Sequence, residues 1–368
     1  MPGDKELGVS PEAYIRQIGE IEFVRRHQCG LRTLAAFEKS PVPDDWRELM
    51  RLYMVRRTRS FIKDNYAETD PATGRKFLRF NDGTLSYFPD RVPKRVAFTV
   101  DDADPNDLYA KLYASGVVDL INHLELPRYG LGNHVLENPK IPPTAPEDAI
   151  LANLSRAGKR LMGFCRTNLF KRLESSGYSF LLSVERHILR NFILLYALEN
   201  TLPVPIGTQS SELLDTHYED TDEEGLLIGD GDSAGGGPLR TEEDFRKRAK
   251  AVYEMYTKQS KGSFGWLSST LFKKGLAESL LRDALSLIRV FDGVPEWDPK
   301  RDTKLNALEE LVTKTHANQK VLIFIQFADT VEFLDRELRR RGIANASGVT
   351  GQSPNVVELA CRFSPVSN

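Results

Sequence analysis

The sequence has few cysteines and no long apolar run. Its three cysteines, Cys29, Cys165 and Cys361, lie far apart, and none belongs to a CxxC pair. This usage excludes a disulfide framework and a thiolate zinc site, and it indicates a reduced, cytoplasmic protein. Nowhere do as many as about 18 apolar residues follow one another, the length that indicates a membrane-spanning helix, so we expect no membrane partner.

The motifs of several common enzyme classes are missing too. The sequence contains no GxxxxGK[ST] phosphate loop, and the nearest string, Ser155 to Arg160, lacks the leading glycine and the hydroxyl that should follow the lysine. Neither HExxH nor GxSxG occurs, and the six histidines are scattered. We therefore expect no catalytic residue, no metal and no cofactor in these 368 residues.

Charge is nearly balanced overall but unevenly distributed. The net charge is −2, so any nucleic-acid surface must be local. Residues 156–172 carry six cations and no acid, residues 51–63 form a second basic cluster, and residues 246–274 form a third. Such clusters supply the sequence-independent part of nucleic-acid affinity, although a solvated helix face or internal ion pairs would produce the same pattern.

Most of the chain has helical periodicity. Helices are expected within 11–66, broken at Pro41 and Pro43, and at 148–173, 178–199, 241–259, 271–290 and 303–316. The 178–199 helix is apolar on two faces and should be largely buried. The Asn81–Gly83 turn between alternating apolar residues predicts a hairpin, and residues 95–100 are a further strand candidate.

Two segments depart from this helical pattern. Residues 215–232 hold eight carboxylates and no Lys or Arg, which predicts a mobile acidic linker over 213–238 that could recruit protein partners. Near the C-terminus, Val321 to Ile325 suit a strand buried on both faces, and Asp329 three residues before Glu332 indicates the start of a helix. A second helix start follows at Ser353, so the pattern predicts the opening of a parallel α/β sheet.

Five stretches stand in an order that resembles the junction between the two RecA-like lobes of Swi/Snf-type superfamily-two helicases. They are MVRRTRSFI at 54–62, YFPDRVPKRVAFTVDD at 87–102, DLYAKLY at 107–113, RDTKLNALEELV at 301–312 and KVLIFIQFADTVEFLDREL at 320–338. The stretch at 169–209 further resembles the long bacterial helicases of this class that carry a phospholipase-D-like domain. The resemblance covers most of the chain outside the acidic segment.

The resemblance implies an internal segment of a larger enzyme. In that family, ATP is held by a phosphate loop, a DExH-type motif and a Ser-Ala-Thr motif in the first lobe, and by an arginine finger late in the second. None of these is present, so this segment should not hydrolyse ATP, whereas ATP and Mg²⁺ are expected for the full-length parent. The expected partner is DNA, most readily double-stranded. The alternative is a helical protein-interaction scaffold without enzymatic activity.

The expected fold is mostly α, with a helical inter-lobe region, a small β-hairpin and the beginning of a RecA-like parallel α/β lobe. The expected regions are 1–66 with the arginine brace, 67–212 with the hairpin, the linker at 213–238, the helices of 239–318, and the truncated second lobe at 319–368. The basic clusters and the loops after the second lobe's strands give these candidate nucleic-acid contacts: Arg56, Arg57, Arg59, Lys159, Arg160, Arg166, Gln326, Phe327, Thr350 and Gly351.

Overall fold

The computed structural model describes residues 7–53, 59–89, 92–154, 158–206, 239–259 and 264–364. Within it the chain forms two compact units, Met1–Arg95 and Val96–Asn368. This division falls inside the expected 67–212 region. The acidic segment 213–238, expected to be a mobile linker, lies outside the described residues.

The first unit contains short helices around a small apolar core. Its helices are α1 (Glu12–Ile18), α2 (Glu20–His27), α3 (Leu34–Glu38), α4 (Pro43–Tyr53) and α5 (Arg59–Asn65). The buried Asp45 carboxylate fastens α4 to the start of α1, because it accepts hydrogen bonds from the Ala13 and Tyr14 N–H groups at 2.7 and 3.1 Å. The break expected near Pro43 is confirmed, since α4 begins at that residue.

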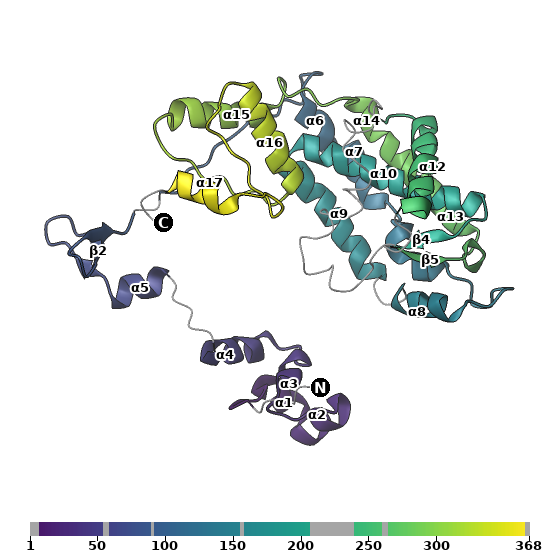
Figure 1. Ribbon diagram of the computed structural model, residues 1–368, viewed down its shortest axis with the longest axis horizontal. Coiled ribbons are helices and arrows are strands. Elements are labelled where there is room, and N and C mark those ends of the chain that lie inside the picture. The colour runs from purple at the N-terminus through teal and green to yellow at the C-terminus, as the bar shows by residue number, and fades with distance from the viewer. Residues whose placement is uncertain are drawn as a thin grey trace. The chain divides into compact units, whose positions relative to one another are not determined.

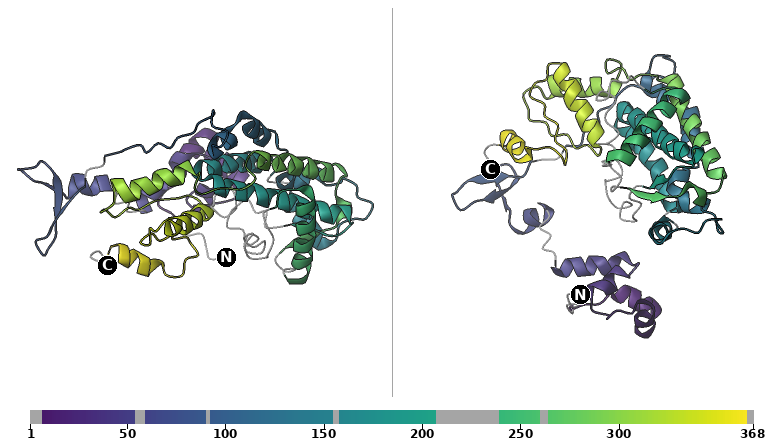
Figure 2. Two further views of the ribbon diagram at one scale, coloured as in Figure 1. Left: turned by 90° about the horizontal axis from the view of Figure 1, so that it is seen from above. Right: turned by 45° about the vertical axis from the view of Figure 1, so that its right-hand side comes forward.

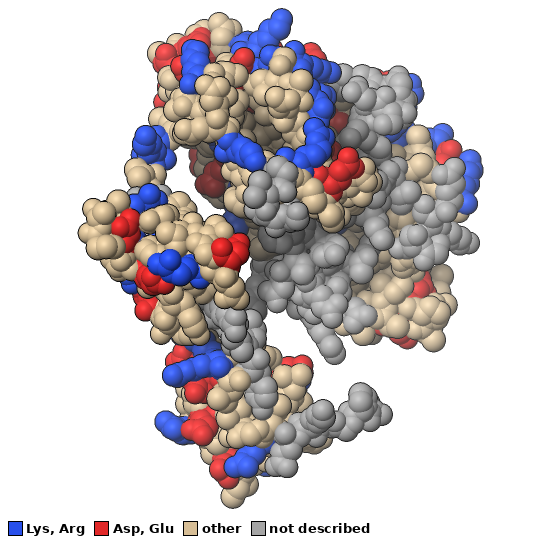
Figure 3. Space-filling view, turned by 60° about the vertical axis from the view of Figure 1, so that its left-hand side comes forward, with Lys and Arg blue, Asp and Glu red and all other residues tan. Residues whose placement is uncertain are grey.

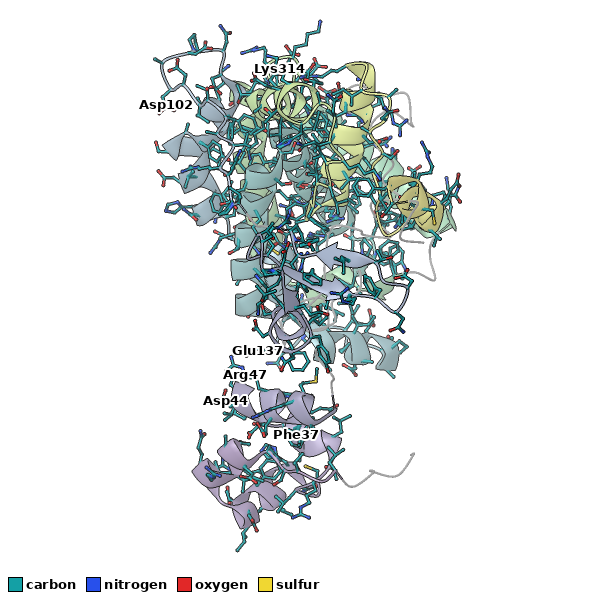
Figure 4. The ribbon with its side chains drawn as sticks, turned by 90° about the vertical axis from the view of Figure 1, so that its left-hand side faces the viewer. Phe37, Asp44, Arg47, Asp102, Glu137 and Lys314 are labelled. Atoms are coloured by element: carbon teal, nitrogen blue, oxygen red, sulfur yellow. The ribbon has the colours of Figure 1, made fainter. Side chains whose placement is uncertain are left out.

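Helices α3 and α4 also contact one another through aromatic side chains. Phe37 is buried and meets the Trp46 ring edge-on, with the ring centroids 6.3 Å apart. Figure 4 labels Phe37, Asp44 and Arg47. Asp44 and Arg47 form an exposed ion pair along α4, with Arg47 Nη1 2.7 Å from Asp44 Oδ1. The core of this part of the unit is therefore largely apolar, and the charged side chains of α4 other than Asp45 remain at its surface.

The expected hairpin is confirmed and gains a third strand. Strands β1 (Glu68–Thr69), β2 (Lys76–Arg79) and β3 (Leu85–Tyr87) form an antiparallel sheet in that order. The turn between β2 and β3 places Gly83 at φ 84°, a conformation that glycine adopts without strain. Phe77 on β2 faces Tyr87 on β3 at a ring-centroid distance of 5.3 Å, a cross-strand pair that stabilises this register.

The second unit is largely helical. Its elements are α6 (Leu108–Tyr113), α7 (Ser115–His123), the 3₁₀ segment η1 (Pro127–His134), α8 (Ala145–Leu154), α9 (Gly158–Ser175), α10 (Gly177–Glu199), β4 (Val204–Ile206), α12 (Glu242–Gln259), β5 (Gly265–Leu267), η5 (Ser269–Leu271), α13 (Gly275–Ile288), α14 (Val290–Gly293), α15 (Thr303–Glu310), η6 (Leu311–Thr315), α16 (Ala328–Arg340) and α17 (Val356–Phe363). Strands β4 and β5 pair antiparallel. None of the described helices is long and apolar enough to cross a bilayer.

Helix α10 is the centre of this unit. It packs against α9, α12 and α13, and Figures 1 and 2 show it running among them. Leu181, Val184, Ile188 and Phe192 on one face are buried, and so are residues of the second stripe such as Ile193. The prediction of a buried helix with two apolar faces is confirmed. Burying side chains of this size contributes about 1.5–3 kcal/mol each, so α10 contributes substantially to the unit's stability.

A close contact between Gly177 and Trp297 fixes the start of α10. A Cβ atom at position 177 would lie 2.1 Å from the Trp297 ring, so only glycine allows the indole to reach this position. The Trp297 Nε1–H donates to the Asp302 carboxylate at 3.2 Å. Asp302 also caps α15 by accepting the Leu305 N–H at 2.9 Å. The first turn of α10 is thereby connected to the first turn of α15.

Two expected strands are not formed. Residues 95–100 and 321–325 form no strand in the described part of the chain, and both described sheets are antiparallel, so no parallel α/β sheet is found there. The reason is that a strand requires a neighbour, and the described part of 319–364 provides none. Only the helices of the expected α/β portion are present, as α16 and α17.

The expected helix starts at Asp329 and Ser353 also need correction. The residue preceding α16 is Phe327, without a side-chain cap, and Asp329 lies inside the first turn. The residue preceding α17 is Asn355, and Ser353 instead belongs to a turn with Thr350.

Candidate functional site

The strongest concentration of buried polar groups lies where the start of α16 meets α9 and α10. The Asp329 carboxylate accepts from Arg172 Nη1 at 2.6 Å and from Arg186 Nη1 and Nη2 at 2.8 and 3.1 Å. The Arg172 side chain is only 2% exposed, and Asp329 is 12% exposed. Two guanidinium groups therefore share one carboxylate in a largely dehydrated environment, where charge-assisted hydrogen bonds are strong.

These arginines determine the ionisation of Asp329. Burial alone would raise the pKa of its carboxyl group, but the charges and hydrogen bonds of Arg186 and Arg172 outweigh that effect and lower the pKa below its ordinary value of 3.8. The Arg172 guanidinium also lies 4.7 Å from the centroid of the Phe327 ring, a cation–π contact that the buried phenyl group provides. Asp329 is thus a stable anion at neutral pH.

Hydroxyl groups continue the network along the same helices. Thr330 Oγ1 is 3.0 Å from Ser175 Oγ and 2.8 Å from Ser179 Oγ, and Ser183 Oγ donates to the Ser179 carbonyl at 2.9 Å. The small serine side chains leave room for α16 to approach α10. On the adjoining surface Tyr178 stacks on Phe333 with ring centroids 4.6 Å apart, which adds an apolar contact beside the polar one.

A cavity of about 300 Å³ lies beside this junction, within the second unit. Its polar lining includes Tyr109, Ser176, Asp302, Lys304 and Gln326, and its apolar lining includes these residues: Leu305, Leu308, Ile323, Ile325, Phe333 and Leu334. Its volume is at the lower end of the range for small-molecule sites.

The polar groups of the cavity mostly satisfy one another. Tyr109 Oη donates to Asp302 at 3.3 Å and accepts the Gly177 N–H at 3.3 Å. Burial raises the pKa of Asp302 and of Tyr109, and it lowers the pKa of Lys304, whose ammonium group donates to the Glu174 carbonyl. The hydrogen bonds of Tyr109, Asp302 and Lys304 therefore stabilise the fold around the cavity.

The cavity lacks the arrangement that a catalytic site needs. Its carboxylate caps a helix, its lysine is held by a carbonyl, and no nucleophile stands beside a base. Among the described residues no group of three potential ligands could hold a metal ion. The hydrogen bonds of Tyr109 and Asp302 hold the starts of α10 and α15 together.

The first group of predicted site residues, those in the basic clusters, is only partly described. Arg59 is exposed on α5, and its guanidinium lies 5.8 Å from the Phe88 ring centroid. Arg56 and Arg57 lie outside the described residues. Lys159 and Arg160 belong to α9, but their side chains also lie outside the described part. Their role as nucleic-acid contacts stays a prediction.

Arg166 occupies a structural position on the same helix. Its Nη2 donates to the Leu124 carbonyl at 2.5 Å, and the side chain is half-buried. Together with Arg172, it shows that part of the 156–172 basic cluster points into the fold. Internal pairing, one of the two explanations left open by the sequence, thus accounts for Arg166 and Arg172.

The predicted loop residues fall in two separate places. Gln326 and Phe327 adjoin the cavity and the Arg172 guanidinium. Thr350 and Gly351 lie in a turn where the Thr350 N–H donates to Ser353 Oγ at 2.9 Å. Both pairs belong to loops that adjoin α16, since the Gly348 N–H of the second loop donates to Asp335 at 2.7 Å, and their role as nucleic-acid contacts stays a prediction. Phe327 packs under the helix and Thr350 caps a turn.

Sequence reasoning missed the central pairing of the site. Arg172 and Arg186 lie 157 and 143 residues before Asp329, so no local pattern connects them. One signal was available in Ser179 and Ser183, whose four-residue spacing places two small hydroxyl side chains on one side of the 178–199 helix. Such spacing favours close approach of another helix.

The exposed arginines of α16 are paired with acids. Figure 3 shows Lys and Arg side chains gathered toward the top of that view, with acidic side chains among them. On α16, Arg336, Arg339 and Arg340 form ion pairs with Glu337 or Asp335, and Arg341, directly after the helix, pairs with Glu309. This run is therefore internally neutralised to a large extent, which weakens it as a phosphate-binding surface.

Comparison of the chain with family models, with curated proteins and with solved structures gives no match.

Proposed function

We propose that this chain is an internal segment of an ATP-dependent, Swi/Snf-like DNA helicase or translocase. In this proposal it contributes the coupling between the two lobes and part of the nucleic-acid surface, and it is not catalytically competent alone. The ordered series of five sequence stretches carries the proposal. Residues 319–368 would begin the second RecA-like lobe, and the parent would bind ATP and Mg²⁺ and act on double-stranded DNA in the cytoplasm.

The junction at Asp329 supports the coupling role. Arg172 and Arg186 hold the first turn of α16 to α9 and α10, and Thr330 adds a hydroxyl contact to the same helices. A displacement of α16 therefore has to move α9 and α10 or break a buried ion pair. This is the property needed in an element that transmits motion between a helical region and a lobe.

DNA binding is the direct test. The 368-residue chain should bind unrelated duplexes with similar affinity, measured by fluorescence anisotropy at several salt concentrations. The double variant Lys159→Gln/Arg160→Gln should weaken binding equally for all sequences and flatten the slope of log affinity against log salt by up to about 2, because each lost phosphate contact contributes about 0.9. Arg166 is left unchanged because its hydrogen bond to Leu124 supports the fold.

A matched control removes the same charge elsewhere. Lys140→Gln/Lys314→Gln neutralises two exposed lysines away from α9 and should leave the salt slope unchanged. If the chain binds no duplex even at low salt, or if both double variants behave alike, the nucleic-acid role is lost. The chain should also hydrolyse no ATP above background, with or without DNA.

The alternative, a protein-interaction scaffold, is favoured by one observation. The 321–325 segment and α17 expose apolar side chains such as Leu322, Phe324 and Val357. Such surfaces are typical of protein contacts rather than of nucleic-acid contacts. A scaffold would bind no DNA under the conditions above.

A further inference from the structure

One face of the three-stranded sheet in the first unit carries aromatic rings and guanidinium groups side by side. Phe77 on β2 is paired with Tyr87 on β3, so their side chains point to the same face, with ring centroids 5.3 Å apart. Arg75 and Arg79, two residues before and after Phe77, point to that face too. The Arg79 guanidinium lies 5.6 Å from the Phe77 ring centroid. The Arg75 guanidinium lies 5.3 Å from the Tyr87 ring centroid. We call this surface the Tyr87 face.

The opposite face of the sheet contacts α5, which Figure 1 shows next to β2. Lys76 Nζ donates to the Lys63 carbonyl of α5 at 3.1 Å. The Arg59 guanidinium, also on α5, lies 5.8 Å from the Phe88 ring centroid. On the Tyr87 face, in contrast, both arginines are exposed, and Tyr87 itself is 37% exposed. The rings and cations of this face are therefore accessible to a ligand.

We propose that the Tyr87 face binds single-stranded nucleic acid. Aromatic rings and guanidinium planes are the surfaces on which unpaired bases stack, and arginines also supply positive charge for the backbone phosphates. A duplex cannot use the face in this way, because its bases are stacked on one another. Leu85 is the one aliphatic side chain that the described strand pairing places on this face, so a protein partner would find little apolar area there. The inference goes beyond the proposed function, whose ligand is double-stranded DNA.

Two acids on the same face compete with phosphate for its hydrogen-bond donors. Glu68 accepts from Arg79 Nη2 at 3.1 Å, and Asp70 accepts from Tyr87 Oη at 3.1 Å. The side chains of Arg79 and Glu68 are 54% and 53% exposed, and an ion pair so exposed contributes little to stability. A phosphate can therefore replace Glu68 beside Arg79 at small cost.

The charge balance of α5 and the sheet sets the expected affinity. Residues 59–89 carry five Lys or Arg side chains against four Asp or Glu side chains. Attraction for the phosphates is therefore modest, and base stacking should supply most of the binding free energy. We expect a dissociation constant on the order of 10 µM at low salt.

Fluorescence anisotropy on the 368-residue chain tests the stacking contact. The probes are a labelled thymidine oligomer of about 15 nucleotides and a labelled duplex of the same length. Tyr87→Leu removes the ring but keeps an apolar side chain, and it should weaken binding of the oligomer about tenfold while leaving duplex binding unchanged. Tyr87→Phe is the matched control, because it loses the hydrogen bond to Asp70 but keeps the ring, and it should bind the oligomer as the parent does.

Two charge changes test the phosphate contact. Arg79→Gln should weaken binding of the oligomer and flatten the slope of log affinity against log salt by about 0.7, the value for one phosphate of a single strand. Glu68→Gln removes the competing carboxylate and should strengthen binding severalfold. If the pair of Arg79 and Glu68 serves only the fold, both variants lower the melting temperature and leave the affinity and its salt slope unchanged, a result that overturns the proposal.

The two probes separate this inference from the helicase proposal. A chain that binds the duplex but not the oligomer overturns the inference and leaves the helicase proposal standing. Equal binding of the oligomer by Tyr87→Leu and Tyr87→Phe also overturns it, because the binding site would then lie elsewhere. Oligomer binding that depends on the Tyr87 ring, in a chain that binds no duplex, supports the inference and contradicts the duplex-binding role.

Discussion

Replacing Asp329 by alanine should destabilise the second unit by about 3 kcal/mol. The carboxylate accepts three hydrogen bonds from two guanidinium groups, at 2.6, 2.8 and 3.1 Å, and Arg172 is only 2% exposed. Breaking a buried pair by removing one partner costs about 3–5 kcal/mol. Arg186 is more exposed than Arg172 and can be partly rehydrated, which places the expected loss at the lower end of that range.

Urea unfolding followed by tryptophan fluorescence measures this loss. Trp46 belongs to the first unit, so a Trp46→Phe background leaves Trp266 and Trp297 to report on the second. Glu310→Ala is the control, because it removes an exposed i,i+4 pair with a lysine on the same unit and should leave the transition almost unchanged. A loss for Asp329→Ala of less than about 1 kcal/mol would refute the view that a dehydrated ion pair joins α16 to α9 and α10.

Three further outcomes are expected. Gly177→Ala should destabilise the second unit by about 3 kcal/mol in the same urea assay, because the added methyl group would lie 2.1 Å from the Trp297 ring. Asp283→Ala should cost about 3 kcal/mol, since the buried Leu126 N–H and the part-buried Glu125 N–H lose their acceptor. Burial, and after it the nearby arginines, lower the pKa of His187 in the folded state well below 6.5, so the unfolded state binds the proton at a higher pH than the folded state does. The free energy of unfolding should therefore fall as the pH drops below about 6.5, by at most about 1.4 kcal/mol per pH unit. His187→Gln should flatten that pH dependence.

Each of these expectations has a result that contradicts it. A Gly177→Ala variant as stable as the parent would mean that the indole moves aside at no cost. Full stability in Asp283→Ala would show that water replaces the carboxylate. An unchanged pH profile in His187→Gln would assign the dependence to another group.

The parts of the fold that sequence predicts well are those set by local pattern. The two apolar stripes of α10 require burial on two sides, and its neighbours provide it. The Asn81–Gly83 turn determines a hairpin because few residues tolerate the positive φ found at Gly83. In contrast, the apolar run at 321–325 indicates a tendency to be buried, but a pattern cannot supply the neighbouring strand on which a sheet depends.

The candidate site was less predictable than the fold, because its contacts join residues that lie far apart in the sequence. Asp329 looked like a helix cap because it stands three residues before Glu332, whereas its actual partners lie on helices more than a hundred residues earlier. Arg172 belonged to a cluster of cations that suggested a solvent-facing surface, and it is among the most buried large side chains. A basic cluster in the sequence identifies the charged residues, but it does not predict whether each side chain faces the solvent or the core.

The central position of α10 has a consequence for synthesis on the ribosome. The helix ends at Glu199, but α13, one of its main packing partners, is complete only at Ile288, roughly 90 residues later. At translation rates of about 5–20 residues per second, its apolar stripes would remain without that cover for roughly 5 to 20 seconds. A nascent chain at this stage exposes apolar side chains that are buried in the folded protein, and faster elongation between 200 and 288 should raise the yield of correctly folded protein.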